Sequence, residues 1–157
     1  MIAVLAALSL PVAATQARDP PISADRLLGT WEGIVADEGR VVMVNVGQGR
    51  TTAATGVLRG PLDPMITTFS IEKTDVANGR VTWEGRSSDL TNYRVRISGV
   101  GTEGNGYGRI TAKVNLMNRD GRKVIEWSTT LIGRQTSYSS GLARLMEELR
   151  QKLNSKP

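Results

Sequence analysis

Between residues 30 and 132 the chain repeats one pattern, in which a short run of alternating apolar and polar residues is followed by a turn rich in Gly, Asn or Asp. Alternation with a period of two places successive side chains on opposite faces of a β-strand. The turn residues supply the positive φ that tight hairpins require. Eight segments show this pattern, and we expect them to be strands: 30–36, 40–46, 52–59, 66–73, 80–84, 93–99, 107–116 and 123–132.

Successive hairpins of this kind predict an all-β fold, an eight-stranded up-and-down antiparallel barrel. Closure is favoured because it removes the exposed edges of the sheet. A β-sandwich shows the same alternation, so the sequence leaves barrel and sandwich open.

The period changes after residue 132. Apolar residues then recur at helical spacing, which predicts a C-terminal amphipathic helix that begins with a serine cap at Ser139 or Ser140. Its apolar stripe consists of Leu142, Leu145, Met146, Leu149 and Leu153. We expect this stripe to pack on the outside of the barrel; the alternative is a surface for a partner or a membrane.

The first 17 residues are apolar and end in Thr15, Gln16 and Ala17, which is typical of a secretory signal peptide. A retained membrane helix is disfavoured because the run is shorter than about 18 apolar residues and contains Pro11. The predicted organisation is therefore a signal peptide at 1–17, an N-terminal lead at 18–28, a β-barrel domain at 29–136 and a C-terminal helix at 137–157. This organisation predicts a periplasmic or secreted protein with no transmembrane span in the mature chain.

Composition argues against most hydrolytic enzymes. The chain has no cysteine and no histidine, which removes thiolate chemistry, disulfides and the commonest general base and zinc ligand. We therefore expect a protein that is not an enzyme and that needs no metal or cofactor. The formal net charge of +5 favours acidic partners.

Two features at the ends of the predicted sheet suggest a family. Gly29, Thr30 and Trp31 open the first predicted strand, and Arg134 follows the last. This arrangement resembles the calycin barrels, the lipocalins and avidins. The resemblance implies that Trp31 closes the floor of the barrel and that Arg134 covers it in a cation–π contact. The avidin residues that bind biotin are not matched after Trp31, so biotin binding is not expected.

Three aromatic residues are candidates for a ligand site inside the barrel. By alternation, Trp83, Trp127 and Tyr93 point inward. Ordinary core packing is the alternative for buried tryptophans.

Four cations, Arg94, Arg96, Arg109 and Lys113, are expected to point outward on two neighbouring strands. Together they predict a basic face that could receive phosphate groups, an acidic protein or an anionic lipid; a solvated surface is the alternative. No outward aromatics alternate with these cations, which disfavours single-stranded nucleic acid.

Two functions follow, and a third, an enzyme without His or Cys, stays open only through carboxylates and tyrosine. The favoured hypothesis is an exported, non-catalytic barrel that binds a small apolar or amphipathic ligand in its interior. The alternative is an envelope protein-interaction module whose basic face binds an acidic partner.

Overall fold

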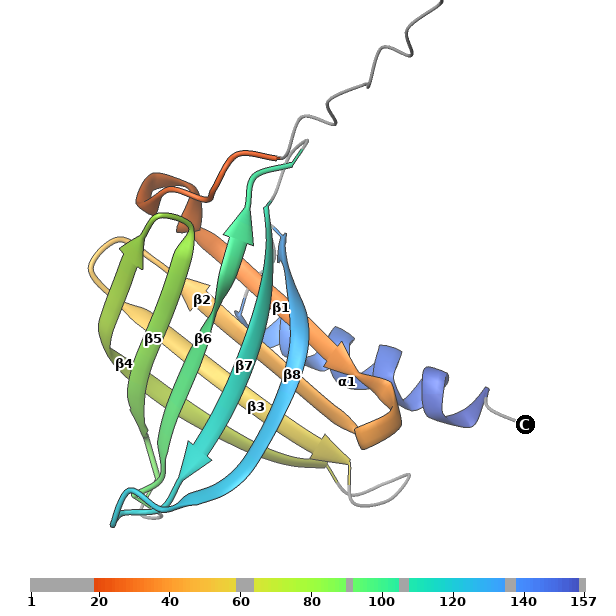
Figure 1. The fold of residues 1–157 in the computed structure, drawn as a ribbon. Helices are drawn as coiled ribbons and strands as arrows, with labels where there is room; N and C mark the ends of the chain where they lie inside the picture. The colour runs from red at the N-terminus through yellow and green to blue at the C-terminus, as the bar shows by residue number, and fades with distance from the viewer. Residues whose placement is uncertain (1–18, 59–63, 90–91, 105–107, 135–137, 156–157) are drawn as a thin grey trace, which may run out of the picture.

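The protein forms a closed barrel of eight antiparallel strands in which each strand pairs with the next and β8 pairs with β1 (Figure 1). The computed structural model describes residues 19–58, 64–89, 92–104, 108–134 and 138–155. The strands are β1 (Gly29–Val35), β2 (Arg40–Val46), β3 (Thr51–Leu58), β4 (Pro64–Ala77), β5 (Arg80–Ser87), β6 (Arg94–Thr102), β7 (Arg109–Met117) and β8 (Lys123–Arg134). Closure between β1 and β8 confirms the barrel and excludes the sandwich.

The barrel interior is an apolar core built by alternation. In β2, Val42 and Val44 belong to this core, whereas Val41 and Met43 contact a second cluster on the outside of the barrel. All four side chains are fully buried. The uninterrupted apolar run of β2 is therefore explained by burial on both faces.

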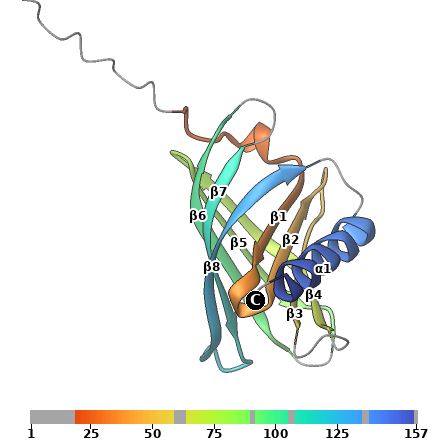
Figure 2. The same cartoon turned by 90° about the vertical axis from the view of Figure 1, so that its right-hand side faces the viewer.

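The outer cluster lies beneath α1 (Tyr138–Asn154), which crosses the outside of β1, β2 and β3 (Figure 2). Leu142, Leu145, Met146 and Leu149 are buried against this wall. The helix therefore packs as the apolar stripe predicted. Its start differs from the expectation, because the helix begins at Tyr138 and both serines lie inside its first turn.

Four strands, β4, β5, β6 and β8, are longer than predicted, and β4 and β5 show why. In β4 the pairing with β5 shifts between Ile71 and Lys73, and this bulge breaks the period of two that marked the strand. The predicted β5 ends at residue 84, just before Gly85. The strand continues because the glycine allows β4 to approach: a Cβ at Gly85 would lie 2.3 Å from the carbonyl oxygen of Ser70.

The N-terminal lead covers one end of the barrel. A short helix, η1 (Ala24–Leu27), precedes β1, and Ile22 and Leu27 join the interior core. The predicted signal peptide, residues 1–17, lies outside the described residues, as does Tyr107. Of the helices that the structure describes, none has the length and hydropathy required to cross a membrane.

Candidate functional site

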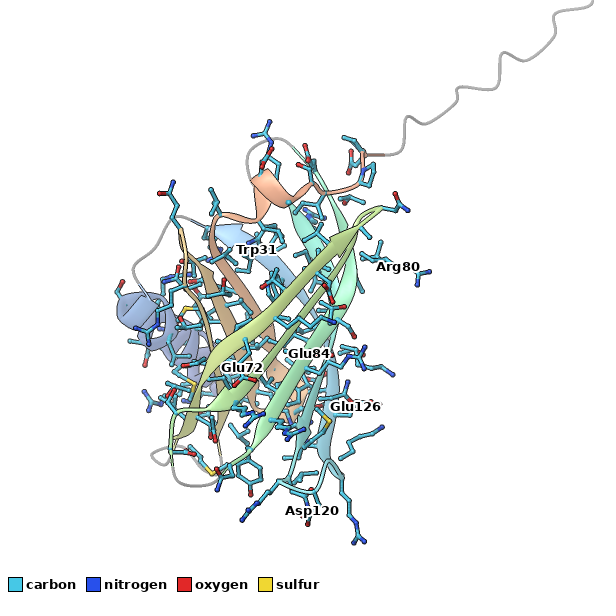
Figure 3. All side chains as sticks on the ribbon, turned by 90° about the vertical axis from the view of Figure 1, so that its left-hand side faces the viewer. Trp31, Glu72, Arg80, Glu84, Asp120 and Glu126 are labelled. Carbon is cyan, nitrogen blue, oxygen red and sulfur yellow. The ribbon has the colours of Figure 1, made fainter. Side chains whose placement is uncertain are left out.

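The barrel has two ends that are built differently. One end carries the N-terminal lead and the β2–β3, β4–β5 and β6–β7 connections; we call it the Trp31 end. The other carries η2 (Ala36–Glu38), which joins β1 to β2, and the β5–β6 and β7–β8 turns; we call it the Trp127 end. Figure 3 shows Trp31 beneath the N-terminal lead and Asp120, in the β7–β8 turn, at the opposite end.

At the Trp31 end the core is covered by packing and hydrogen bonds, beside a hollow of about 950 Å³ lined by residues of the lead and of β6, β7 and β8. The Trp31 indole N–H donates to the carbonyl oxygen of Leu27 at 2.8 Å, and its ring is buried in the core. The lead is held along β6, because Ile22 N–H donates to the Gly101 carbonyl at 3.0 Å and Glu103 N–H to the Pro20 carbonyl at 2.8 Å. These N–H groups all have acceptors within the protein, so none of them is left to bind a ligand at this end.

The Trp127 end contains an inward arginine. Arg40 precedes Val42 by two residues in β2, so it shares the inner face, and its guanidinium carbon lies 5.3 Å from the centre of the Trp127 ring. The same guanidinium donates from Nη1 to the Glu126 carbonyl at 3.3 Å and forms an ion pair with Glu38 at 3.0 Å.

Three N–H groups of this arrangement have no acceptor. Within the part of the chain that the structure describes, the Trp83 Nε1, Trp127 Nε1 and Arg40 Nε atoms are buried without a hydrogen-bond partner. The two tryptophans lie in one row across the wall, in which register pairs Trp83 with Ile97, Ile97 with Val114 and Val114 with Trp127. An unsatisfied buried donor costs about 1–3 kcal/mol. This cost makes the interior of the Trp127 half the strongest candidate site.

The sequence placed Trp83, Trp127 and Tyr93 inside the barrel, and the structure orients all three there. Trp83 is 0 % exposed and Trp127 is 3 % exposed, while Tyr93 is partly buried against the same core. Leu116 and Ile125 are likewise only partly buried. The core is therefore closed around Trp83, and its partly buried residues lie toward the two ends of the barrel. A ligand role for these residues stays a prediction.

Arg134 lies elsewhere than the sequence suggested. Trp31 pairs with Gly133 in the register of β1 and β8, so Gly133 shares its face and Arg134 points outward. There, Arg134 Nε lies 3.6 Å from Glu32 Oε2. The expected stacking of Arg134 on Trp31 is thus wrong. The cation–π contact found among the described residues joins Arg40 to Trp127 at the other end.

Glu32 anchors the helix to the barrel. Its side chain is 1 % exposed and forms ion pairs with Arg134 and with Arg144 of α1, and both arginines also pair with Glu148. Burial lowers the pKa of Arg144, but the hydrogen bonds and charges of Glu32 and Glu148 outweigh it, so the pKa of Arg144 is raised. This ion-pair network joins α1 to the barrel wall and has a structural role.

The predicted basic face is divided and partly neutralised. Arg94, Arg96, Arg109 and Lys113 are all exposed on the outside, but Arg109 pairs with Thr102 near the Trp31 end, far along the strands from Arg94, which pairs with Met117. Arg96 forms an ion pair with Glu84 at 3.2 Å, and Lys113 with Glu126 at 3.4 Å. The four cations therefore do not form one continuous patch.

Carboxylates alternate with cations over this wall. Figure 3 shows Glu72, Glu84 and Glu126 among the side chains of the wall that α1 leaves uncovered. A hydrogen bond from Lys123 at 2.9 Å, aided by Lys113, lowers the pKa of Glu126, and a hydrogen bond to Asp75 raises the pKa of Lys73. These pairs place opposite charges beside each other, which is typical of an exposed sheet face.

Sequence reasoning missed Arg40 as a site residue. The signal was present, because positions 40, 42, 44 and 46 alternate and Val42 and Val44 are inward. A cation at the first position of a strand is usually solvated, so alternation alone does not single out Arg40.

The described residues contain no group of three or more acidic side chains placed to hold a metal ion. Comparison of the chain with protein-family models, with curated proteins and with solved structures gives no match, so function has to be inferred from the barrel's own residues.

Proposed function

We propose that this protein is an exported, calycin-like barrel that binds a small amphipathic molecule at its Trp127 end without catalysing a reaction. The observation that carries the proposal is the set of three buried donors without acceptors, Trp83 Nε1, Trp127 Nε1 and Arg40 Nε. Buried polar groups in folded proteins are nearly always paired, with protein, water or ligand. A ligand that carries acceptor oxygens would remove this cost.

The chemistry of the ligand follows from these donors. All three groups donate and none accepts, so the complementary group is an oxygen acceptor such as a carboxylate or carbonyl. Arg40 favours an anionic acceptor. The surrounding core is apolar, including Val95, Ile97 and Val114. The rest of the ligand is therefore an apolar chain or ring.

Entry is expected from the Trp127 end. The Trp31 end is covered by Ile22 and Leu27, whereas Tyr93 and Ile125 at the Trp127 end are only partly buried. Because Trp83 and Trp127 are almost fully buried, a ligand has to displace the side chains that cover them. Binding thus requires a local opening at this end.

Export and the absence of catalysis are parts of the same proposal. The apolar leader at 1–17 supports export, and the lack of histidine and cysteine supports a binding role. The alternative, an interaction module with a basic face, is less well supported because Arg96 and Lys113 already pair with Glu84 and Glu126.

The proposal is tested by calorimetric titration of the purified protein with dodecanoate, a probe with a carboxylate and an apolar chain. Trp127→Phe keeps an aromatic ring but removes one unpaired N–H, and we expect affinity to fall about tenfold, as for loss of a hydrogen bond to a charged group. Trp31→Phe is the matched control, since its N–H already bonds to Leu27, and affinity should change less than about twofold.

Absence of dodecanoate binding, or equal losses in both variants, would contradict this site. Native mass spectrometry of protein purified from its exported fraction gives an independent check. Extra mass that leaves on denaturation is expected, and its chemistry should include an oxygen acceptor.

A further inference from the structure

Three arginines meet on the outside of the barrel at its Trp127 end. Arg86 comes from the end of β5, Arg94 from the start of β6 and Arg119 from the β7–β8 turn, and with Asn92 they line a surface hollow of about 270 Å³. A water molecule occupies about 30 Å³ in the liquid. The hollow therefore has room for a polyatomic ion or headgroup.

The charges around this hollow are not balanced. Arg86 and Arg94 lie directly opposite each other in the register of β5 and β6, a placement that is destabilising for like charges. Arg86 has a carboxylate partner, Glu72, at 3.3 Å. Arg94 and Arg119 form no ion pair with any residue that the structure describes.

Neighbouring cations on the same wall do have carboxylate partners. Arg96 pairs with Glu84, while Lys113 and Lys123 share Glu126. The sheet thus supplies a carboxylate to the next outward arginine along β6, yet leaves Arg94 without one. Two of the three arginines at the hollow, Arg94 and Arg119, therefore have no carboxylate partner among the described residues.

The third arginine is carried by a well-defined turn. The side-chain oxygen of Asn118 accepts hydrogen bonds from the backbone N–H groups of Asp120 and Arg122, at 3.1 and 2.9 Å. Gly121 N–H donates to the Asn118 carbonyl at 3.0 Å. These bonds fix the backbone on both sides of Arg119 and hold it near the strand arginines before any ligand binds.

We propose that Arg86, Arg94 and Arg119 form a binding site for a phosphate group on the outer face of the barrel. Guanidinium groups present paired N–H donors that match phosphate oxygens, and a shared anion would relieve the repulsion between Arg86 and Arg94. The site is separate from the barrel interior, because Arg86 and Arg94 lie on the opposite face of the wall from Trp83 and Tyr93, and Arg119 lies in the β7–β8 turn. It does not depend on the interior ligand.

Pyrophosphate titration at low ionic strength tests the site, since salt screens exposed charges. We expect Arg94→Gln and Arg119→Gln each to weaken binding about tenfold, and Arg94→Lys to restore only part of it because the paired donors are lost. Arg80→Gln is the matched control: Arg80 is exposed and lies toward the Trp31 end in Figure 3, away from Asp120. It should change affinity less than about twofold.

A second arm identifies the source of the phosphate. Flotation of the protein with vesicles containing phosphatidic acid, compared with phosphatidylcholine vesicles, tests a lipid headgroup. Capture that Arg94→Gln abolishes and Arg80→Gln preserves supports a lipid source, and pyrophosphate binding without capture supports a soluble phosphate compound. Equal losses for Arg80→Gln and Arg94→Gln would show general attraction to net charge and overturn the site, as would no binding to either probe.

Discussion

The two ends of the barrel place a tryptophan in different surroundings. Trp31 and Trp127 both point into the core and both are nearly fully buried. The Trp31 indole donates its N–H to Leu27 beneath a covering segment, whereas the Trp127 indole has no acceptor within the described chain and is stacked against Arg40. A fully satisfied tryptophan indicates a structural role, whereas the unsatisfied donor of Trp127 beside Arg40 is an observation on which the proposed ligand site depends.

Truncating Trp31 or Trp127 to alanine should produce the largest difference in stability between the two ends. Trp31→Ala removes a buried ring and the bond to Leu27, so we expect a loss of about 4–5 kcal/mol in the free energy of unfolding. Trp127→Ala leaves a comparable cavity but no broken N–H bond, and about 3 kcal/mol is expected. Urea denaturation of both variants measures the difference. A larger loss for Trp127→Ala would reverse the assignment of the two ends.

Displacing the covering segment should have a smaller effect, confined to the Trp31 end. A Cβ at Gly101 would lie 2.5 Å from Ile22 Cγ2, so Gly101→Ala forces the lead away from β6. Overpacking of this kind costs about 1–3 kcal/mol. Hydrogen exchange should rise at Ile22, whose N–H bonds to the Gly101 carbonyl, and stay unchanged at Val114. Unchanged exchange at Ile22 would show that the lead does not depend on this close approach.

The fold was largely predictable because period-two alternation is a local signal. The strand at 40–46 was predicted correctly although Met43 interrupts the alternation. Met43 faces the outside of the barrel and is buried under α1, which leaves the strand itself unchanged. The bulge near Ile71 and the glycine at 85 were not predictable, because they depend on which backbone lies alongside. The alternation of residues therefore predicts which segments form strands, whereas contacts between neighbouring strands determine where each strand ends.

The site was less predictable because it depends on register. Arg134 follows the last strand in sequence, but a shift of one residue decides whether it shares a face with Trp31, and β1 places Trp31 opposite Gly133. The partnership of Arg40 with Trp127 joins residues from β2 and β8, which the turn sequences do not relate. Alternation predicts whether a single side chain points inward. Which two side chains contact each other depends on the strand register of the closed barrel, which the sequence does not give.

The smallest expected effect is on the pH dependence of stability, through Glu126 at the Trp127 end. The hydrogen bond from Lys123, with Lys113 nearby, lowers the pKa of Glu126 below its ordinary value of 4.5, and the Glu126 backbone carbonyl also accepts from Arg40. A carboxylate with a lowered folded-state pKa stabilises the fold above its unfolded pKa, and this stabilisation is lost as pH falls through the folded value. The native protein should therefore lose slightly more stability than Glu126→Gln on acidification below about pH 4.5. Urea midpoints across this range, repeated at high salt, measure the effect, which salt should reduce because the pair is exposed. Identical acid dependence in both proteins at low salt would show that Lys123 and Lys113 do not hold this carboxylate in its charged form.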